Sequence, residues 1–288
     1  MCRLFAFRSV FESQVHNSLL NAQNALYQQA PRHPDGWGVA YYVDRVPHII
    51  RSPCSAMEDQ IFKKISGVVS SKTLLAHLRK ATVGSHSVMN LHPFQFGPWV
   101  FAHNGHLKNF DNYRAFLLNQ ISPKLRPFVL GETDSEVFFF LMLSYLFDEL
   151  DPKKRNQNIV SIQTLEAAII KSLKLLFSTV GPVAAHPSQN SKDNYYTFII
   201  TNGELILGYN GGQPLYYTTH KNCCPIRDSC AYYAKNCETF SVTGSKINHI
   251  LMSSEPIQGE NVWQKLPVGS RVSLDASMRL DIKSLLVV

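Results

Sequence analysis

TFIITNGELILGYN, residues 197–210, carries the strongest local fold signal in the chain. Two apolar runs flank Asn202-Gly203, and an Asn-Gly pair in that setting indicates a two-stranded hairpin. Further apolar runs rich in aromatic and branched residues follow toward the C-terminus, at residues 214–219, 240–244 and 249–257. The C-terminal part of the chain is therefore predicted to be mainly β-sheet.

Upstream of this hairpin, strand-like and helix-like patterns are mixed. Residues 1–8 and the strand-turn-strand pattern at 36–50 predict early strands, and residues 73–78 and 99–103 predict short buried strands that lead into polar residues. Such strand ends often carry chemistry. Helical spacing covers five segments: 11–29, 57–69, 111–119, 134–150 and 161–179. With no repeat or long linker, residues 1–288 are expected to form a single domain of mixed α and β structure.

The composition indicates a globular protein. Of the 288 residues, 45% are hydrophobic and 11% aromatic, which is enough for a substantial core, and only 17% are charged. No apolar run is long enough to cross a membrane, and the first residues lack the pattern of a secretion signal. We expect a cytoplasmic location and no membrane partner.

The charge and the cysteines suggest no further partner class. The net charge of +7 comes from scattered Lys and Arg residues, so a solvated surface is expected rather than a nucleic-acid site. Four of the six cysteines lie close together, at Cys223, Cys224, Cys230 and Cys237, with spacings that fit no common zinc template. Reduced thiols are the first expectation, with a disulfide or metal second, and neither a metal nor another cofactor is predicted.

Cys2 is the first candidate catalytic residue. If Met1 is removed, Cys2 carries the free α-amine of the chain, whose pKa near 8 suits a general base. The thiol would then be a nucleophile with its base on the same residue. The alternative is that Cys2 is only a small buried residue on the first strand.

Four downstream segments strengthen the catalytic interpretation. They are Asp35-Gly36-Trp37-Gly38, His77-Leu78-Arg79-Lys80-Ala81-Thr82, His103-Asn104-Gly105 and Gly131-Glu132-Thr133-Asp134-Ser135-Glu136. Together with Met1-Cys2 they resemble the class II glutamine amidotransferases, which belong to the N-terminal-nucleophile hydrolases. The resemblance covers about residues 1–145 and extends weakly to residues 254–256 and 263–267, which are similar to the stand-alone γ-glutamyl amidohydrolase branch.

The resemblance implies a binding site for the glutamyl end of a substrate. Arg79 would hold the α-carboxylate with two parallel hydrogen bonds, Asp134 would receive the α-ammonium, and Thr82 would line the pocket. Taken alone, Arg79 could equally be a salt-bridging residue and Asp134 the start of a helix.

The resemblance also implies an oxyanion hole. The side-chain amide of Asn104 and the backbone N–H of Gly105 would stabilise the negative oxygen that develops when Cys2 attacks an amide. Their neighbour His103 is grouped with the substrate-binding residues, and a structural role for its ring remains open. Without the other segments, Asn104-Gly105 would be read as a tight turn.

The implied fold is the N-terminal-nucleophile hydrolase fold, an α+β architecture in which two stacked antiparallel sheets lie between helices as a four-layer α-β-β-α sandwich. The implied substrate is glutamine or a γ-glutamyl small molecule. Three functions stay open. They are a γ-glutamyl amide hydrolase, a glutaminase subunit that supplies ammonia to a separate synthase partner, and a non-catalytic binding protein on the same fold.

Overall fold

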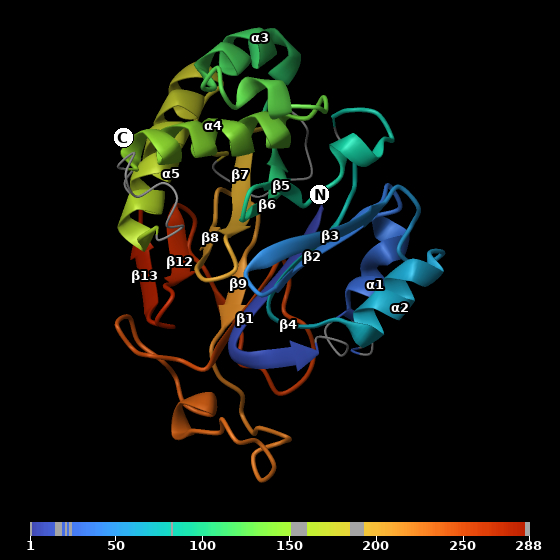
Figure 1. Ribbon diagram of the computed structural model, residues 1–288, viewed down its shortest axis with the longest axis vertical. Helices are drawn as coiled ribbons and strands as arrows, with labels where there is room; N and C mark the ends of the chain where they lie inside the picture. The colour runs from blue at the N-terminus through green and yellow to red at the C-terminus, as the bar shows by residue number, and fades with distance from the viewer. Residues whose placement is uncertain are drawn as a thin grey trace.

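The protein is seen here as a computed structural model that describes residues 2–14, 19, 20, 22, 25–81, 83–150, 160–184 and 193–285. Its strands form two antiparallel sheets (Figure 1). The seven-stranded sheet has the order β11-β9-β10-β1-β4-β2-β3. Its strands are β1 (Arg3–Gln14), β2 (Trp37–Val43), β3 (Val46–Ser52), β4 (Ser70–Leu78), β9 (Tyr216–Thr218), β10 (His249–Ser253) and β11 (Gln264–Lys265).

The six-stranded sheet has the order β13-β12-β8-β7-β6-β5. It places β6, which carries His103, Asn104 and Gly105, between β5 and β7. Its strands are β5 (Phe94–Phe96), β6 (Trp99–His106), β7 (Tyr195–Thr201), β8 (Ile206–Tyr209), β12 (Ser270–Leu274) and β13 (Leu280–Ser284).

Helices cover the outer face of each sheet. Helices α1 and α2 lie on the seven-stranded sheet, and α3, α4 and α5 lie on the six-stranded sheet (Figure 1). The helices are α1 (Leu26–Gln29), α2 (Gln60–Val68), α3 (Phe110–Gln120), α4 (Asp134–Glu149) and α5 (Ile162–Thr179). The layer order is therefore α-β-β-α, which confirms the predicted four-layer sandwich.

Burial of both faces of each sheet explains the amino-acid pattern of the strands. In β1, Leu4 and Ala6 point into the layer between the sheets, whereas Phe5 and Phe7 point toward α1 and α2. Successive side chains of a strand point to opposite faces, so a strand covered on both sides must be apolar at nearly every position. This is why residues 3–8 show only a loose alternation in sequence.

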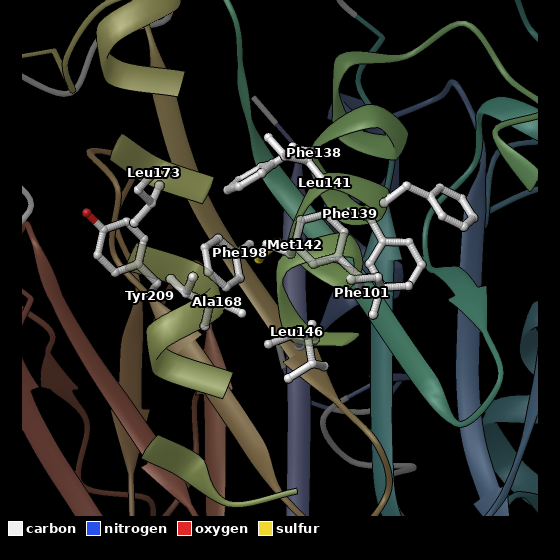
Figure 2. Close-up of a cluster of buried hydrophobic side chains, with 14 of the residues drawn as sticks. Phe101, Phe138, Phe139, Leu141, Met142, Leu146, Ala168, Leu173, Phe198 and Tyr209 are labelled. Carbon is white, nitrogen blue, oxygen red and sulfur yellow. The ribbon is translucent and has the colours of Figure 1, made fainter. Parts of the chain in front are cut away.

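The largest apolar cluster lies between the six-stranded sheet and its helices. Figure 2 shows Phe101 and Phe198 on the sheet facing Phe138, Met142 and other side chains of α4. Helix α4 is buried along most of its length because α3, α5 and the sheet all pack against it. The helix begins at a cap in which the Thr133 side chain accepts from the N–H of Glu136. The cap and the packing together fix the position of Asp134.

Most elements predicted from sequence are present, and two predictions were wrong. Residues 11–14 continue β1 instead of starting a helix, and α1 covers only Leu26–Gln29; the positions between them lie partly outside the described residues. Residues 240–244 form no strand, because they belong to an irregular excursion between β9 and β10 (Figure 1). Short strands β5, β12 and β13 were not predicted.

No helix in the described ranges is long and apolar enough to span a bilayer.

Candidate active site

Predicted site residues from distant parts of the chain meet around one small cavity. Cys2, Arg79, His103, Gly105 and Asp134 all line it. Cys2 precedes β1 and Arg79 follows β4, two strands that are paired from Arg3 and Leu78 onward. Residues 103 and 105 come from β6, and Asp134 begins α4. The cavity therefore lies where one end of the sheet sandwich meets the N-terminus of a helix.

The Cys2 thiol is held against the backbone of Lys80. The Lys80 N–H donates to Sγ over 3.3 Å, and Sγ lies 3.4 Å from the Lys80 carbonyl oxygen, to which the thiol can donate. Burial raises the pKa of the Cys2 thiol, and the hydrogen bond from Lys80 partly offsets this. At neutral pH the side chain is therefore a thiol, so its use as a nucleophile requires a base.

The Arg79 guanidinium is buried and bonded only to neutral oxygens. It donates to the carbonyl oxygens of Val83, Gly84 and Ser85 at 3.0, 3.2 and 3.2 Å. Its side chain is 3% exposed, and burial lowers its pKa while the nearby Cys2 and Asp35 oppose that change. The cation thus sits at the cavity with no carboxylate within 4.0 Å among the described residues.

The segment that covers Arg79 is held in place by Glu132. One carboxylate oxygen of Glu132 accepts from the N–H and the hydroxyl of Ser85, at 2.9 and 2.8 Å, and from the Asn90 amide at 3.1 Å. Asn90 accepts in turn from the Glu132 N–H at 2.8 Å. These contacts join residues more than 40 positions apart and could not be predicted from local sequence.

Asp134 is oriented by its own helix and by the end of β6. One carboxylate oxygen accepts from the Leu107 N–H at 2.7 Å, and the other accepts from the N–H and the hydroxyl of Ser135 at 2.8 and 3.2 Å. A carboxylate offers about four acceptor positions, so one remains for a donor in the cavity. Asp134 therefore both begins helix α4 and lines the cavity, so the two interpretations made from sequence are compatible.

Asn104 does not line the cavity, but Ser254 links it to Leu4, two residues after Cys2. The Ser254 hydroxyl accepts from the Leu4 N–H at 2.9 Å and lies 3.5 Å from the Asn104 amide nitrogen. The Asn104 side-chain oxygen is buried without a hydrogen-bond partner among the described residues. Ser254 thus connects the start of β1 in one sheet to β6 in the other, a role that residue types alone did not reveal.

His103 lies under the backbone of Gly105. Its Nδ1 is 2.9 Å from the Ser135 hydroxyl and its Nε2 is 3.0 Å from the Tyr195 carbonyl oxygen. A Cβ at position 105 would lie 1.9 Å from His103 Nε2 and 2.1 Å from the Tyr195 oxygen, so only glycine fits. The bonded ring therefore positions the strand, while one edge of it reaches the cavity.

Two more histidines belong to the surroundings of the site: His92 lines the cavity, and the His77 ring packs against that of His92. His77 and His92 have ring centroids 4.3 Å apart, and none of their four ring nitrogens has a partner among the described residues. Burial lowers the pKa of His77 to about 3 and that of His92 well below its usual value. Both rings are neutral at physiological pH. Thr82, predicted to line the pocket, lies outside the described residues.

The six cysteines are free thiols, and the described part of the chain contains no cluster of three or more His, Cys, Asp or Glu side chains arranged to hold a metal.

The sequence matches the class II glutamine amidotransferase family over residues 1–281. The chain belongs to this family. Among curated proteins, it is 29% identical over 226 residues to "Probable glutamine amidotransferase DUG3" of Saccharomyces cerevisiae. That match covers 72% of this chain and 62% of the yeast protein, so the chain spans less than two thirds of that relative's length.

Two further comparisons extend the list of similar proteins. Over 72 residues it is 39% identical to the γ-glutamyl-hercynylcysteine sulfoxide hydrolase of Mycobacterium tuberculosis, which covers 25% of this chain and 31% of that protein. A solved glutamine aminotransferase class-II domain protein from Silicibacter pomeroyi superposes with a TM-score of 0.61. The superposition covers 99% of both chains at 20% identity, which supports the shared fold.

Proposed function

We propose that this amidotransferase cleaves the γ-amide of glutamine or of a γ-glutamyl compound through a thioester on Cys2. One observation carries the proposal: a cysteine thiol, a buried unpaired guanidinium and a carboxylate line the same cavity at Cys2, Arg79 and Asp134. These are the groups needed to attack an amide while holding the carboxylate and the ammonium of an amino acid.

Substrate binding requires a local rearrangement. The cavity has a volume of about 20 Å³, which is room for roughly one water molecule. The carbonyls of residues 83–85 accept hydrogen bonds from both terminal nitrogens of Arg79 and use three of its five N–H donors. A substrate carboxylate would replace these neutral acceptors with a charged one, which forms stronger hydrogen bonds. Displacement of residues 83–85 would also provide the missing volume.

The first chemical step needs a base because the Cys2 thiol is protonated. If Met1 is removed, the α-amine of Cys2 can take the thiol proton, directly or through a water, as Sγ attacks the amide carbon. The resulting oxyanion would be stabilised by the Asn104 amide and the Gly105 N–H. Met1 lies outside the described residues, so its removal is part of the proposal.

The remaining steps are an ordinary acyl transfer. The carbon–nitrogen bond breaks as the amine returns its proton to the leaving nitrogen, which leaves as ammonia or an amine. A γ-glutamyl thioester remains on Cys2. Water, deprotonated by the same amine, then attacks the thioester, releases glutamate and restores the thiol.

The similarity to a hydrolase of a γ-glutamyl compound supports γ-glutamyl amides larger than glutamine as substrates. We further propose that residues 1–288 act as one domain. A cytoplasmic location stays a prediction from sequence.

The test combines intact mass with glutamate release from L-glutamine and a panel of γ-glutamyl amides, comparing wild type with Cys2→Ala. We expect a mass that lacks Met1 and a loss of turnover on the order of 10⁶-fold in the variant. Turnover that appears only with a copurifying protein would favour the glutaminase-subunit function. Correctly processed wild-type protein that releases no glutamate under either condition would contradict the proposal.

A further inference from the structure

A second pocket lies at the other end of the layer between the sheets. Arg8, Thr73 and Gly203 line it together with charged residues of β1, β4 and two neighbouring turns, and its volume is about 410 Å³. Arg8 pairs with Thr73 in the two central strands, whereas Arg3 pairs with Leu78 at the Cys2 end. Six residues of extended chain separate Cys2 from Arg8, roughly 20 Å.

Arg8 is a buried cation whose hydrogen-bond partners are neutral, while the carboxylates of Glu204 and Asp275 act on it only from a longer distance. Its side chain is 7% exposed and donates to the Thr73 hydroxyl at 3.2 Å and to the Gly203 carbonyl oxygen. Its Nε is buried with no hydrogen-bond partner, and no carboxylate lies within 4.0 Å of the guanidinium in the described ranges. Burial lowers its pKa to about 10, so it remains charged at neutral pH.

An unpaired buried charge is costly, and an anion that reaches it recovers part of that cost. The bonds to Thr73 and Gly203 link the two sheets, but they use a single terminal nitrogen of the guanidinium. They leave the buried Nε without a partner. The lining of a pocket by this group therefore points to an anionic ligand rather than to a purely structural role.

The charged side chains at the rim of the pocket indicate which class of anionic ligand fits. Arg45 and Glu204 pair with each other at 3.0 Å. The rim carboxylates of Glu12 and Asp44 form no ion pair with another described residue, and neither does the Lys72 ammonium. A phosphate dianion would be repelled by these carboxylates. An amino acid offers one carboxylate for the buried cation and one ammonium for the rim.

We propose that this pocket is a second binding site, which takes the zwitterionic end of an amino acid or short peptide. The ligand carboxylate lies against Arg8, and the ligand ammonium lies between Glu12 and Asp44. The pocket volume exceeds that of a single amino acid, so side chains of varied size fit. The site is independent of the Cys2 cavity and does not require the hydrolase activity proposed above.

Saturation-transfer NMR with L-alanine as the probe tests the site, using Arg79→Gln protein so that the proposed substrate clamp contributes no binding. We expect an L-alanine signal that falls at least about tenfold on adding Arg8→Gln, which removes the cation but keeps a polar side chain at this position. Acetate should bind more weakly than L-alanine, and inorganic phosphate should not displace L-alanine.

The rim supplies a control that leaves the buried bonds intact. Glu12→Gln with Asp44→Asn changes two exposed side chains and should weaken L-alanine about three- to tenfold, whereas acetate, which has no ammonium and is repelled by these carboxylates, should bind no more weakly than before. This pair keeps the test valid if Arg8→Gln does not fold. Absence of L-alanine binding, binding that both sets of variants retain, or displacement by phosphate would overturn the proposal.

Discussion

Arg271 and Arg79 are both almost fully buried, at 1% and 3% exposure, yet their surroundings are opposite. Arg271, on β12, donates through all three of its nitrogens to Glu166, Ser273 and Asp281, and two of these partners are carboxylates. Glu166 also pairs with Lys283 at 2.6 Å. Arg79 has only three carbonyl oxygens of a covering segment.

Arg271 belongs to a complete ion network, whereas Arg79 is a cation without a counter-ion among the described residues. Arg271 joins β12 to β13 and to α5, and its charge is already balanced. A ligand could add little there. No carboxylate of the described residues offsets the desolvation cost of the buried Arg79 guanidinium. Pairing with a substrate carboxylate would therefore be favourable. Arg8 resembles Arg79 in having only neutral hydrogen-bond partners, and the binding sites proposed at both residues rest on this difference from Arg271.

The ion network around Arg271 and the candidate active site should respond differently to mutation. The largest effect is expected for Asn104→Ala in the candidate active site. Loss of one oxyanion donor should lower kcat by about 10²- to 10³-fold with little change in KM, because the donor acts mainly in the transition state. Steady-state kinetics on glutamate release would measure this. A change confined to KM would mean that Asn104 binds substrate instead of stabilising the oxyanion.

Arg271→Met should act on stability alone. Removing the cation leaves Glu166 and Asp281 without their common partner, so we expect the free energy of unfolding to fall by about 3 kcal/mol. Urea denaturation would measure the change, and kcat/KM per folded molecule should stay at the wild-type value. Reduced turnover in fully folded variant protein would show that the two regions are coupled.

Arg79→Lys gives the converse result. The single ammonium cannot reproduce two parallel hydrogen bonds to a carboxylate, so KM for glutamine should rise about 10- to 100-fold. The midpoint of urea denaturation should move little, since the lost partners are neutral carbonyls of a surface segment. An unchanged KM would remove Arg79 from the proposed clamp.

The smallest expected effect is on the pH dependence of the free energy of unfolding. His77 has a pKa of about 3 in the folded protein and near 6.5 unfolded, so protons favour the unfolded chain as pH falls below 6.5. Stability is thus retained above pH 6.5 and lost toward pH 3. Between pH 7 and 5.5, the free energy of unfolding should fall about 1 kcal/mol less in His77→Gln than in wild type. Equal pH slopes would contradict the buried neutral state.

Local patterns predicted those parts of the fold that local physics determines. The hairpin at residues 197–210 follows from turn chemistry, and the helix start at Asp134 follows from charge and capping chemistry within a few residues, although the capping residue is Thr133 and Asp134 lies in the first turn. Residues 11–14 were predicted as helix because their composition allows it, but pairing with β4 continues the strand. The layer order came from the family resemblance, since periodicity alone does not give the partner of a strand.

Part of the candidate site was likewise predicted before the structure, and part was not. The resemblance predicted Cys2, Arg79 and Asp134 as site residues, and the structure brings all three to one cavity. It did not predict that Glu132 and Asn90 hold the segment over Arg79, or that Ser254 lies between Leu4 and Asn104. These contacts depend on how separate strands and loops meet, so no spacing in the sequence encodes them.

The packing of His103 under Gly105 has an evolutionary consequence. A smaller residue at position 103 would remove the clash of a new Cβ with the imidazole, yet the clash with the Tyr195 backbone oxygen would remain. No change of side chain at 103 can therefore make a larger residue at 105 acceptable. Among descendants of this sequence, position 103 can drift once other contacts compensate, whereas position 105 is closed to mutation unless strand β7 itself moves.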